Sequence, residues 1–182
     1  HIKTLDIQCY TQDFNCTPDI FWKKADEEGR RGITEIYHIV GMYELWDKLT
    51  EEFPHLLIDN CASGGRRIDI ETLKRSLMLY KTDYQCIFNP NPDVTNVHNT
   101  NASRLFPVTG CSTKKKMDTY AARSTYSATW GIGSYATIFH SMTDDEMKWL
   151  GSVVREYRSI RRFFPCHFHN FGSDKLDLSS WV

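Results

Sequence analysis

The chain has 182 residues, of which 41% are hydrophobic and 25% are charged, a balance typical of one soluble globular domain. Lys and Arg together number 22 against 23 Asp and Glu, so nothing in the charge favours nucleic acid or an anionic membrane as a partner. No run of about 20 apolar residues predicts a membrane span and no signal peptide is visible, so we expect a cytoplasmic protein.

Strand patterns and helix patterns alternate along the chain, which predicts a parallel sheet with helical connections. In chain order we expect strands over residues 5–10, 56–59, 77–80, 124–138 and 165–171, and helices over 33–53, 70–77 and 143–160. Residues 89–116 are expected to be a loop, because Pro and Asn are frequent there.

Two of the helices carry clear signals. The 33–53 segment places apolar side chains at helical spacing on one face: Ile36, Ile39, Val40, Tyr43, Trp46 and Leu49. Pro54 is expected to end this helix. Thr143 followed by Glu146 three residues later is a capping-box sequence, which predicts that a helix begins there.

The order of elements must be assigned to one of two parallel folds. A doubly wound sheet normally carries a glycine-rich phosphate loop after its first strand, and this sequence has none. Instead, acidic and amide side chains follow the predicted strands, as the converging strand ends of a barrel enzyme require. We therefore predict an α/β protein that is a partial (β/α)8 TIM barrel. With about five of eight units, residues 1–182 would be the C-terminal part of the barrel, roughly strands four to eight, truncated at both ends.

Two carboxylic acids follow predicted strands two units apart, Asp13 and Asp83. Hydrolysis of a glycoside with retention of configuration needs two carboxyl groups about 5 Å apart. One attacks the anomeric carbon, and the other protonates the leaving oxygen and later activates water. The spacing along the chain is compatible with that chemistry.

The segment 59–69, with Asn60-Cys61-Ala62-Ser63-Gly64-Gly65 at its centre, resembles the signature of family 36 glycoside hydrolases, the bacterial-type α-galactosidases. Gln12-Asp13-Phe14-Asn15 looks like that family's nucleophile motif, and Lys81-Thr82-Asp83-Tyr84 looks like its acid/base motif. The resemblance implies an α-galactosidase that acts by double displacement, with Asp13 as nucleophile and Asp83 as acid/base. It also implies sugar contacts from four positions: Asn15, Cys61, Gly64 and Gly65.

Arg67 and Asp69 match the tail of the signature. We group Arg67 with the substrate-binding residues, in a supporting and orienting role. Three positions depart from the family pattern, which leaves the exact sugar open: Thr11 stands where Lys or Arg is usual, Gln12 where Trp is common, and Arg66 replaces a third glycine.

Several residues have a simpler reading beside the functional one. Cys61 could be a small buried apolar residue, and the Gly64-Gly65 pair could serve a turn with positive φ. Trp130 is a candidate sugar platform, although core packing is the favoured interpretation. Cys166, His167 and His169 have no identifiable further ligand, so we expect no metal.

The resemblance implies no cofactor and one main partner, an oligosaccharide with a terminal α-galactose. A homo-oligomer of the full-length parent is compatible with it. Three alternatives stay open: a transglycosylase of the same lineage, a sugar-binding protein without activity, and an inactive fragment. Because about three barrel units would be missing, we expect little hydrolase activity from residues 1–182 alone.

Overall fold

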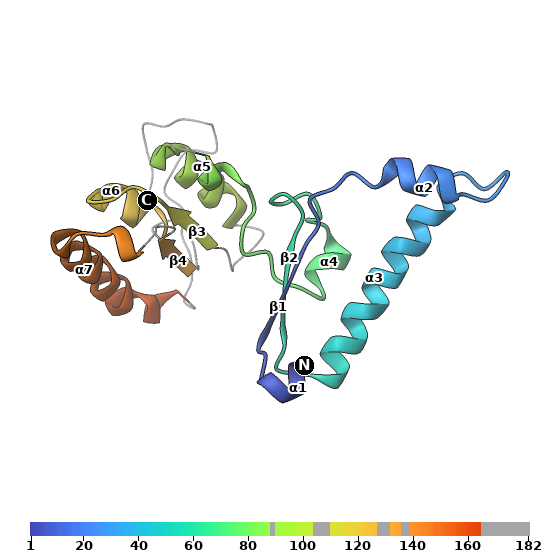
Figure 1. Cartoon of the computed structure of the whole chain (residues 1–182), viewed down its shortest axis with the longest axis horizontal. Coiled ribbons are helices and arrows are strands. Elements are labelled where there is room, and N and C mark those ends of the chain that lie inside the picture. Colours follow the sequence, from blue (N-terminus) through green and yellow to red (C-terminus); the bar gives the residue numbers. More distant parts are fainter. Residues whose placement is uncertain (88–89, 104–109, 127–131, 136–138, 165–182) are drawn as a thin grey trace. The chain divides into compact units, whose positions relative to one another are not determined.

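A computed structural model of the chain describes residues 1–87, 90–103, 110–126, 132–135 and 139–164. The chain divides into two compact units, His1–Leu77 and Met78–Val182, and each is described by itself (Figure 1).

The first unit is a strand–helix–strand motif with short additional helices. Its elements are α1 (Ile2–Leu5), β1 (Cys9–Asp13), α2 (Asp19–Ala25), α3 (Ile33–Glu52), β2 (Leu57–Cys61) and α4 (Ile70–Leu73). The two strands are parallel neighbours, with Cys9 opposite Leu57 and Asp13 opposite Cys61 (Figure 1). Leu77 adds an isolated parallel bridge to Asp59, so the chain returns to the same sheet after α4.

The first strand lies further along the chain than predicted. Residues 5–10 were expected to form it, but Ile2–Leu5 is one helical turn and Asp6 follows in the left-handed region at φ 50°. The strand instead includes Thr11, Gln12 and Asp13. Thr11 and Asp13 lie on its exposed face, and the partly buried Gln12 is bonded by Trp46. The apolar alternation of Leu5, Ile7 and Cys9 therefore misplaced the element.

The long helix α3 confirms the predicted 33–53 segment, and local contacts explain where it begins. The Asp26 carboxylate accepts hydrogen bonds from the backbone N–H of Gly32 (2.7 Å) and of Thr34 (3.0 Å). Both N–H groups belong to the helix start, where no partner within the helix is available. Gly32 takes φ 91°, a conformation that a residue with a Cβ rarely adopts.

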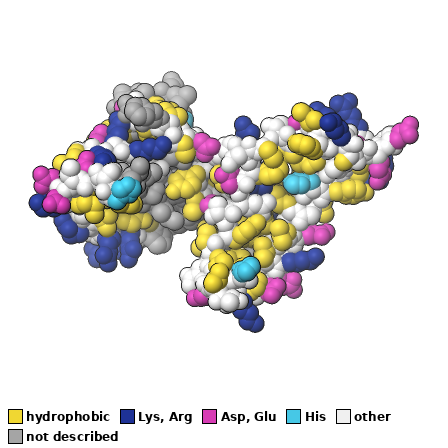
Figure 2. Space-filling view, viewed as in Figure 1, with side chains coloured by type: hydrophobic (Ala, Val, Ile, Leu, Met, Phe, Trp, Pro, Cys, Tyr) yellow, Lys and Arg dark blue, Asp and Glu magenta, His cyan; other side chains and the backbone are white. Residues whose placement is uncertain are grey.

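The core of the first unit lies between α3 and the two strands. It consists of Met42, Trp46 and Ile58, and Tyr10, Tyr43 and Leu49 pack against it. The predicted apolar face was only partly right, because Ile36 and Val40 are 55% and 46% exposed. Figure 2 shows apolar side chains gathered over the visible face of this unit.

The second unit holds a second pair of parallel strands and the remaining helices. Its elements are η1 (Tyr84–Cys86), α5 (Pro92–Ser103), β3 (Gly110–Thr113), α6 (Thr119–Ser124), β4 (Ile132–Tyr135), η2 (Phe139–Ser141), α7 (Asp144–Ile160) and η3 (Arg161–Phe163), where η marks a 3₁₀ turn. Strand β3 pairs with β4 from Gly110 opposite Ile132 to Thr113 opposite Tyr135 (Figure 1).

Predictions for the second unit were right at one helix and wrong at two segments. The Thr143 capping box is present, since Glu146 N–H donates to Thr143 Oγ1 and Thr143 N–H donates to Glu146 Oε2. Residues 89–116 are not a loop, because they contain α5 and β3. Of the strand expected over 124–138, Ile132–Tyr135 forms β4, whereas Ser124 ends α6 and residues 125–126 form a turn. Residues 127–131 and 136–138, and the strand expected over 165–171, lie outside the described residues.

Candidate active site

Asp13 is the last residue of β1, at the carboxyl end of the parallel pair. Alternation along the strand puts Thr11 and Asp13 on its exposed face, while Tyr10 and Gln12 are partly buried. Gln12 accepts a hydrogen bond from Trp46 Nε1 at 2.7 Å, which fixes the inner face of the strand against α3. Asp13 therefore lies on a strand that is anchored to α3, and its side chain is on the exposed face of that strand.

The exposed face also explains one departure from the family pattern. Thr11 lies opposite Asp59 in the register, and its hydroxyl donates to Asp59 Oδ2 at 3.2 Å. Asp59 is only 6% exposed, so this hydrogen bond partners a buried carboxylate. In this chain the Thr11 hydroxyl thus stabilises a side chain of the neighbouring strand, β2.

Hydrogen-bond donors surround the Asp13 carboxylate. The side-chain amide of Asn15 donates to Asp13 Oδ2 at 2.8 Å. This hydrogen bond is the largest cause that lowers the pKa of Asp13 below its ordinary value, and the Cys61 thiol and the backbone N–H of Ser63 act in the same direction. Asp13 is therefore ionised at neutral pH, as a carboxylate nucleophile must be.

The loop after β2 closes over the end of β1. Ser63 and Gly64 both have positive φ, 49° and 72°, and the Ala62 N–H donates to the Gly64 carbonyl at 3.0 Å. The turn interpretation is therefore right for Gly64. Gly65 has no positive φ and forms an isolated bridge with Ala62.

Arg67 ties the ends of the two strands together. Its Nη2 donates to the Gln12 carbonyl at 3.0 Å and to the Cys61 carbonyl at 2.5 Å. The guanidinium lies 5.9 Å from the Phe14 ring centroid and 5.8 Å from that of Trp46. Gln12 precedes Asp13 in β1 and Cys61 lies opposite it in β2, so Arg67 holds the backbone on both sides of Asp13. The orienting role predicted for Arg67 is compatible with these contacts.

Replacing Arg67 with Lys should lower the free energy of unfolding by about 2 kcal/mol, because an ammonium lacks the planar fork that reaches two carbonyls. Urea unfolding of the 182-residue chain measures the change. The matched control is Arg66→Lys at the exposed neighbour, which should stay within about 0.5 kcal/mol of the unsubstituted chain. Equal stability of the two variants would contradict the role assigned to Arg67.

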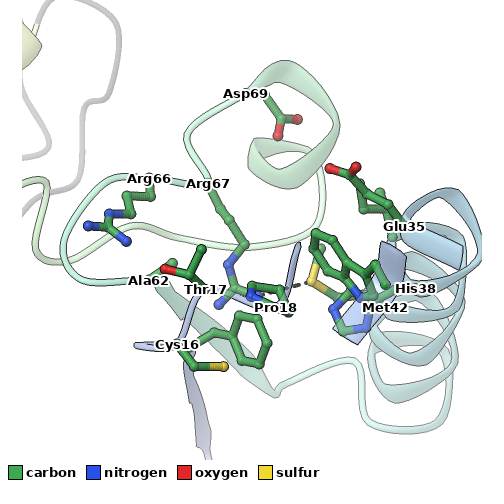
Figure 3. A pocket seen from close by; sticks show the side chains of 13 residues that line it. Cys16, Thr17, Pro18, Glu35, His38, Met42, Ala62, Arg66, Arg67 and Asp69 are labelled. Carbon is green, nitrogen blue, oxygen red and sulfur yellow. Dashed lines mark hydrogen bonds between the residues drawn. The ribbon is translucent and has the colours of Figure 1, made fainter. Parts of the chain in front are cut away.

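A cavity of ≈ 380 Å³ lies in the first unit, next to the loops that follow β1 and β2 (Figure 3). Its walls come from the loop after β1, from α2 and α3, and from the loop after β2: Phe14, Cys16, Thr17, Pro18, Trp22, Glu35, His38, Ile39, Met42, Ala62, Arg66, Arg67 and Asp69. The His38 ring stacks on Phe14 with 5.7 Å between ring centroids, and it contacts Trp22 in a tilted arrangement at 5.2 Å. The sequence interpretation missed this ring cluster, since its members lie on three separate elements.

Asp83 belongs to the second unit, where it is exposed and directly precedes η1. The turn is held by Thr82, whose Oγ1 accepts from the Tyr84 N–H at 3.2 Å. The Tyr84 ring packs edge-on against His98 of α5 at 5.6 Å. Burial lowers the pKa of Lys81 to about 8, so the side chain two residues before Asp83 loses its charge in mildly alkaline solution.

The remaining candidate residues are placed as follows. Cys61 is partly buried at the end of β2. Trp130, Cys166, His167 and His169 lie outside the described residues. Among the residues that are described, no three His, Cys, Asp or Glu side chains are grouped to hold a metal ion. Within those same ranges no helix has both the length and the apolar character needed to cross a bilayer.

Known proteins match this chain in fold and in sequence. An α-galactosidase from Lactobacillus brevis superimposes with a TM-score of 0.73 at 19% identity, over 94% of this chain and 24% of that one. A family 36 α-galactosidase from Geobacillus stearothermophilus, AgaA A355E, gives 0.71 at 19% identity, over 90% of this chain and 23% of that one. The fold is thus shared with part of the family 36 α-galactosidases, whose catalytic domain is a TIM barrel.

Curated relatives agree with these structures. α-Galactosidase 1 of Pediococcus pentosaceus is 46% identical over 70 residues, which cover 37% of this chain and 9% of that protein. The α-galactosidase of Escherichia coli is 51% identical over 41 residues, 22% of this chain and 6% of that protein. The matched spans are thus less than a tenth of either relative's length. The sequence model of the melibiase family matches residues 11–166, a span that includes all of the predicted catalytic and sugar-binding residues: Asp13, Asn15, Cys61, Gly64, Gly65, Arg67 and Asp83. The chain belongs to the melibiase family.

Proposed function

We propose that this chain supplies catalytic machinery of a retaining glycoside hydrolase that releases terminal α-galactosyl residues from oligosaccharides. The observation that carries the proposal is the ionised Asp13 carboxylate, held by Asn15 at the end of a parallel strand in a melibiase sequence. In chain order, we assign β1 and β2 to barrel strands four and five, the segment 77–83 to strand six, and β3 and β4 to strands seven and eight.

The reaction proceeds in two displacements. In the first, an Asp13 oxygen attacks the anomeric carbon, the bond to the leaving oxygen breaks, and Asp83 donates its proton to that oxygen. In the second, Asp83 takes a proton from water, and the water oxygen displaces Asp13 from the anomeric carbon. Galactose leaves with its original configuration, and both carboxyl groups regain their starting protonation states.

The substrate class is supported by what related structures contain. A variant of the Geobacillus enzyme was solved with raffinose and another with stachyose, both oligosaccharides. In this chain we assign the sugar contacts to Asn15, Cys61, Gly64 and Gly65. Gly64 and Gly65 lie on the loop after β2, Cys61 is the last residue of β2, and the absence of a Cβ at Gly64 lets a ligand approach the backbone closely.

A covalent trap tests the proposal directly. The assay uses a polypeptide in which residues 1–182 stand within a complete barrel, because the solved neighbours are about four times longer than the matched span. An activated fluoro-α-galactoside that forms the ester quickly and releases it slowly should add one sugar mass per active site. Peptide mass spectrometry should place that mass on the peptide carrying Asp13.

The matched control is Asp13→Asn, which keeps the size of the side chain and should take up no label. Attachment to Asp83 or to Asp59 would reverse or replace the assigned roles. Turnover of an α-galactoside with no trapped ester on any carboxylate would rule out the double displacement.

A further inference from the structure

Ser63 takes a backbone conformation that its side chain does not favour. Its φ of 49° lies in the left-handed region, which costs a residue with a Cβ about 1 kcal/mol or more. Glycine adopts this region freely, and the next residue, Gly64, does so at φ 72°. A serine at this position therefore needs a compensating contribution from its hydroxyl group.

The hydroxyl makes one contact that a glycine could not make. Ser63 Oγ donates to Asn15 Oδ1 at 2.9 Å, and the Ser63 backbone N–H donates to the same oxygen at 2.9 Å. On the other side of the amide, Asn15 Nδ2 donates to Asp13 Oδ2 at 2.8 Å. The Asn15 carboxamide is therefore held between two donors and the nucleophile.

The orientation of that amide decides whether it stabilises or destabilises the charge of the Asp13 carboxylate. In the structure the NH2 group faces the carboxylate and stabilises its charge. A rotation of the amide by half a turn would present its oxygen to the carboxylate, where two acceptors repel each other. Both Ser63 donors point at the Asn15 oxygen, so both oppose that rotation.

We propose that Ser63 is a positioning residue that fixes the Asn15 carboxamide so that its NH2 group donates to the Asp13 carboxylate. The proposal rests on the proposed function in one respect only, namely that Asp13 is the nucleophile. Asn15 and Ser63 are 48 positions apart in sequence. Their side chains meet because β1 and β2 pair in parallel and end at the same level.

Other charged and titratable groups near Asp13 are held in place by different contacts. The Cys61 thiol lies opposite on β2, and the Arg67 guanidinium, which interacts electrostatically with Asp13, reaches in from the following loop. Neither depends on the Ser63 hydroxyl, because Arg67 is bound to two backbone carbonyls. The Ser63 backbone N–H also lowers the Asp13 pKa directly, but alanine and glycine both keep that N–H, so loss of the hydroxyl alone acts on Asp13 through Asn15.

Two variants separate this role from a merely structural one. Ser63→Ala and Ser63→Gly both remove the hydroxyl, but alanine keeps the unfavourable φ whereas glycine relieves it. We expect the Asp13 pKa to rise by about 0.5 in both variants, as loss of part of one hydrogen bond implies. The midpoint of thermal unfolding should separate the two variants. In Ser63→Ala it should be no higher than in the unsubstituted chain, and in Ser63→Gly it should be higher than in Ser63→Ala.

The measurement is an NMR titration of the Asp13 carboxyl carbon in the 182-residue chain. Ser159→Ala is the control, since Ser159 Oγ donates to the Glu156 carbonyl of α7 and should leave Asp13 unchanged. In an Asn15→Ala background the two Ser63 changes should have no further effect on the pKa, because the group they act through is gone.

The positioning role is overturned if the Asp13 pKa is unchanged in either Ser63 variant. It is also overturned if the Ser63 substitutions shift this pKa as much in the Asn15→Ala background as they do when Asn15 is present. In a complete barrel, both variants should lower kcat/KM on the acidic limb about threefold, the factor that corresponds to 0.5 in pKa. This result is distinguishable from failure of the proposed function. Full activity of Asp13→Asn would refute the nucleophile while leaving the titration result intact.

Discussion

Replacing Asp13 with Ala should lower turnover of an activated aryl α-galactoside at least about 10³-fold, because covalent catalysis loses its nucleophile. In the proposed mechanism the attacking carboxylate is the one that Asn15 holds at the end of β1, and no other residue of that strand is a carboxylic acid. The comparison is made in a complete barrel carrying residues 1–182, at saturating substrate and neutral pH.

Azide should restore part of this activity. Alanine leaves space beside the anomeric carbon, and a small anion can enter that space and attack in place of the carboxylate. The product is then a galactosyl azide of inverted configuration, which NMR of the product identifies. Asp19→Ala is the control, since Asp19 is an exposed carboxylate of α2 that pairs with Lys23. Normal turnover in Asp13→Ala, or a retained product with azide, would contradict the assignment.

Sequence reasoning succeeded where one local signal decided the structure. Helix α7 begins where Thr143 and Glu146 cap each other, and both partners lie within four residues. Helix α3 ends where Pro54 removes a backbone donor, and its 20 residues repeat apolar positions for over five turns. Such signals need no knowledge of the rest of the fold.

The helix α5 was missed although its start carries a comparable signal. Asn91 Oδ1 accepts a hydrogen bond from the Asp93 N–H at 2.9 Å, which is an N-cap contact, and Pro92 occupies the first helical position. Proline suits that position because its missing N–H would have no partner there. Reading the Asn and Pro residues as loop formers hid this alternative.

The candidate site likewise contains residues with a local sequence signal and residues whose contacts depend on the fold. Asp13 and Asn15 could be found in one motif, because they lie two residues apart and their chemistry is local. The Ser63–Asn15 contact spans 48 positions and depends on the parallel register of β1 with β2. Arg67 likewise reaches carbonyls rather than side chains, and a carbonyl carries no sequence signal. Partners of this kind require the fold.

Replacing Asp83 with Asn should separate substrates by their leaving groups. A general acid contributes about 10²- to 10⁴-fold when the departing oxygen needs a proton, and little when it leaves readily as an anion. Glycosylation by an α-galactoside with a strongly acidic phenol should therefore proceed nearly as in the unsubstituted enzyme. In an oligosaccharide such as raffinose the leaving group is a sugar hydroxyl, which without a proton donor would depart as an alkoxide. Activity on raffinose should therefore fall by about the full factor.

The second displacement sharpens this test, because Asp83 also activates water there. With the acidic phenol, the Asp83→Asn enzyme should release one equivalent of phenol in a burst and then turn over slowly, since the galactosyl ester on Asp13 accumulates. Stopped-flow absorbance measures the burst, and Asp145→Asn, at a carboxylate that is 84% exposed on α7, is the control. Equal losses on both substrates without a burst would show that Asp83 supports the fold or binds the sugar, and that another group donates the proton.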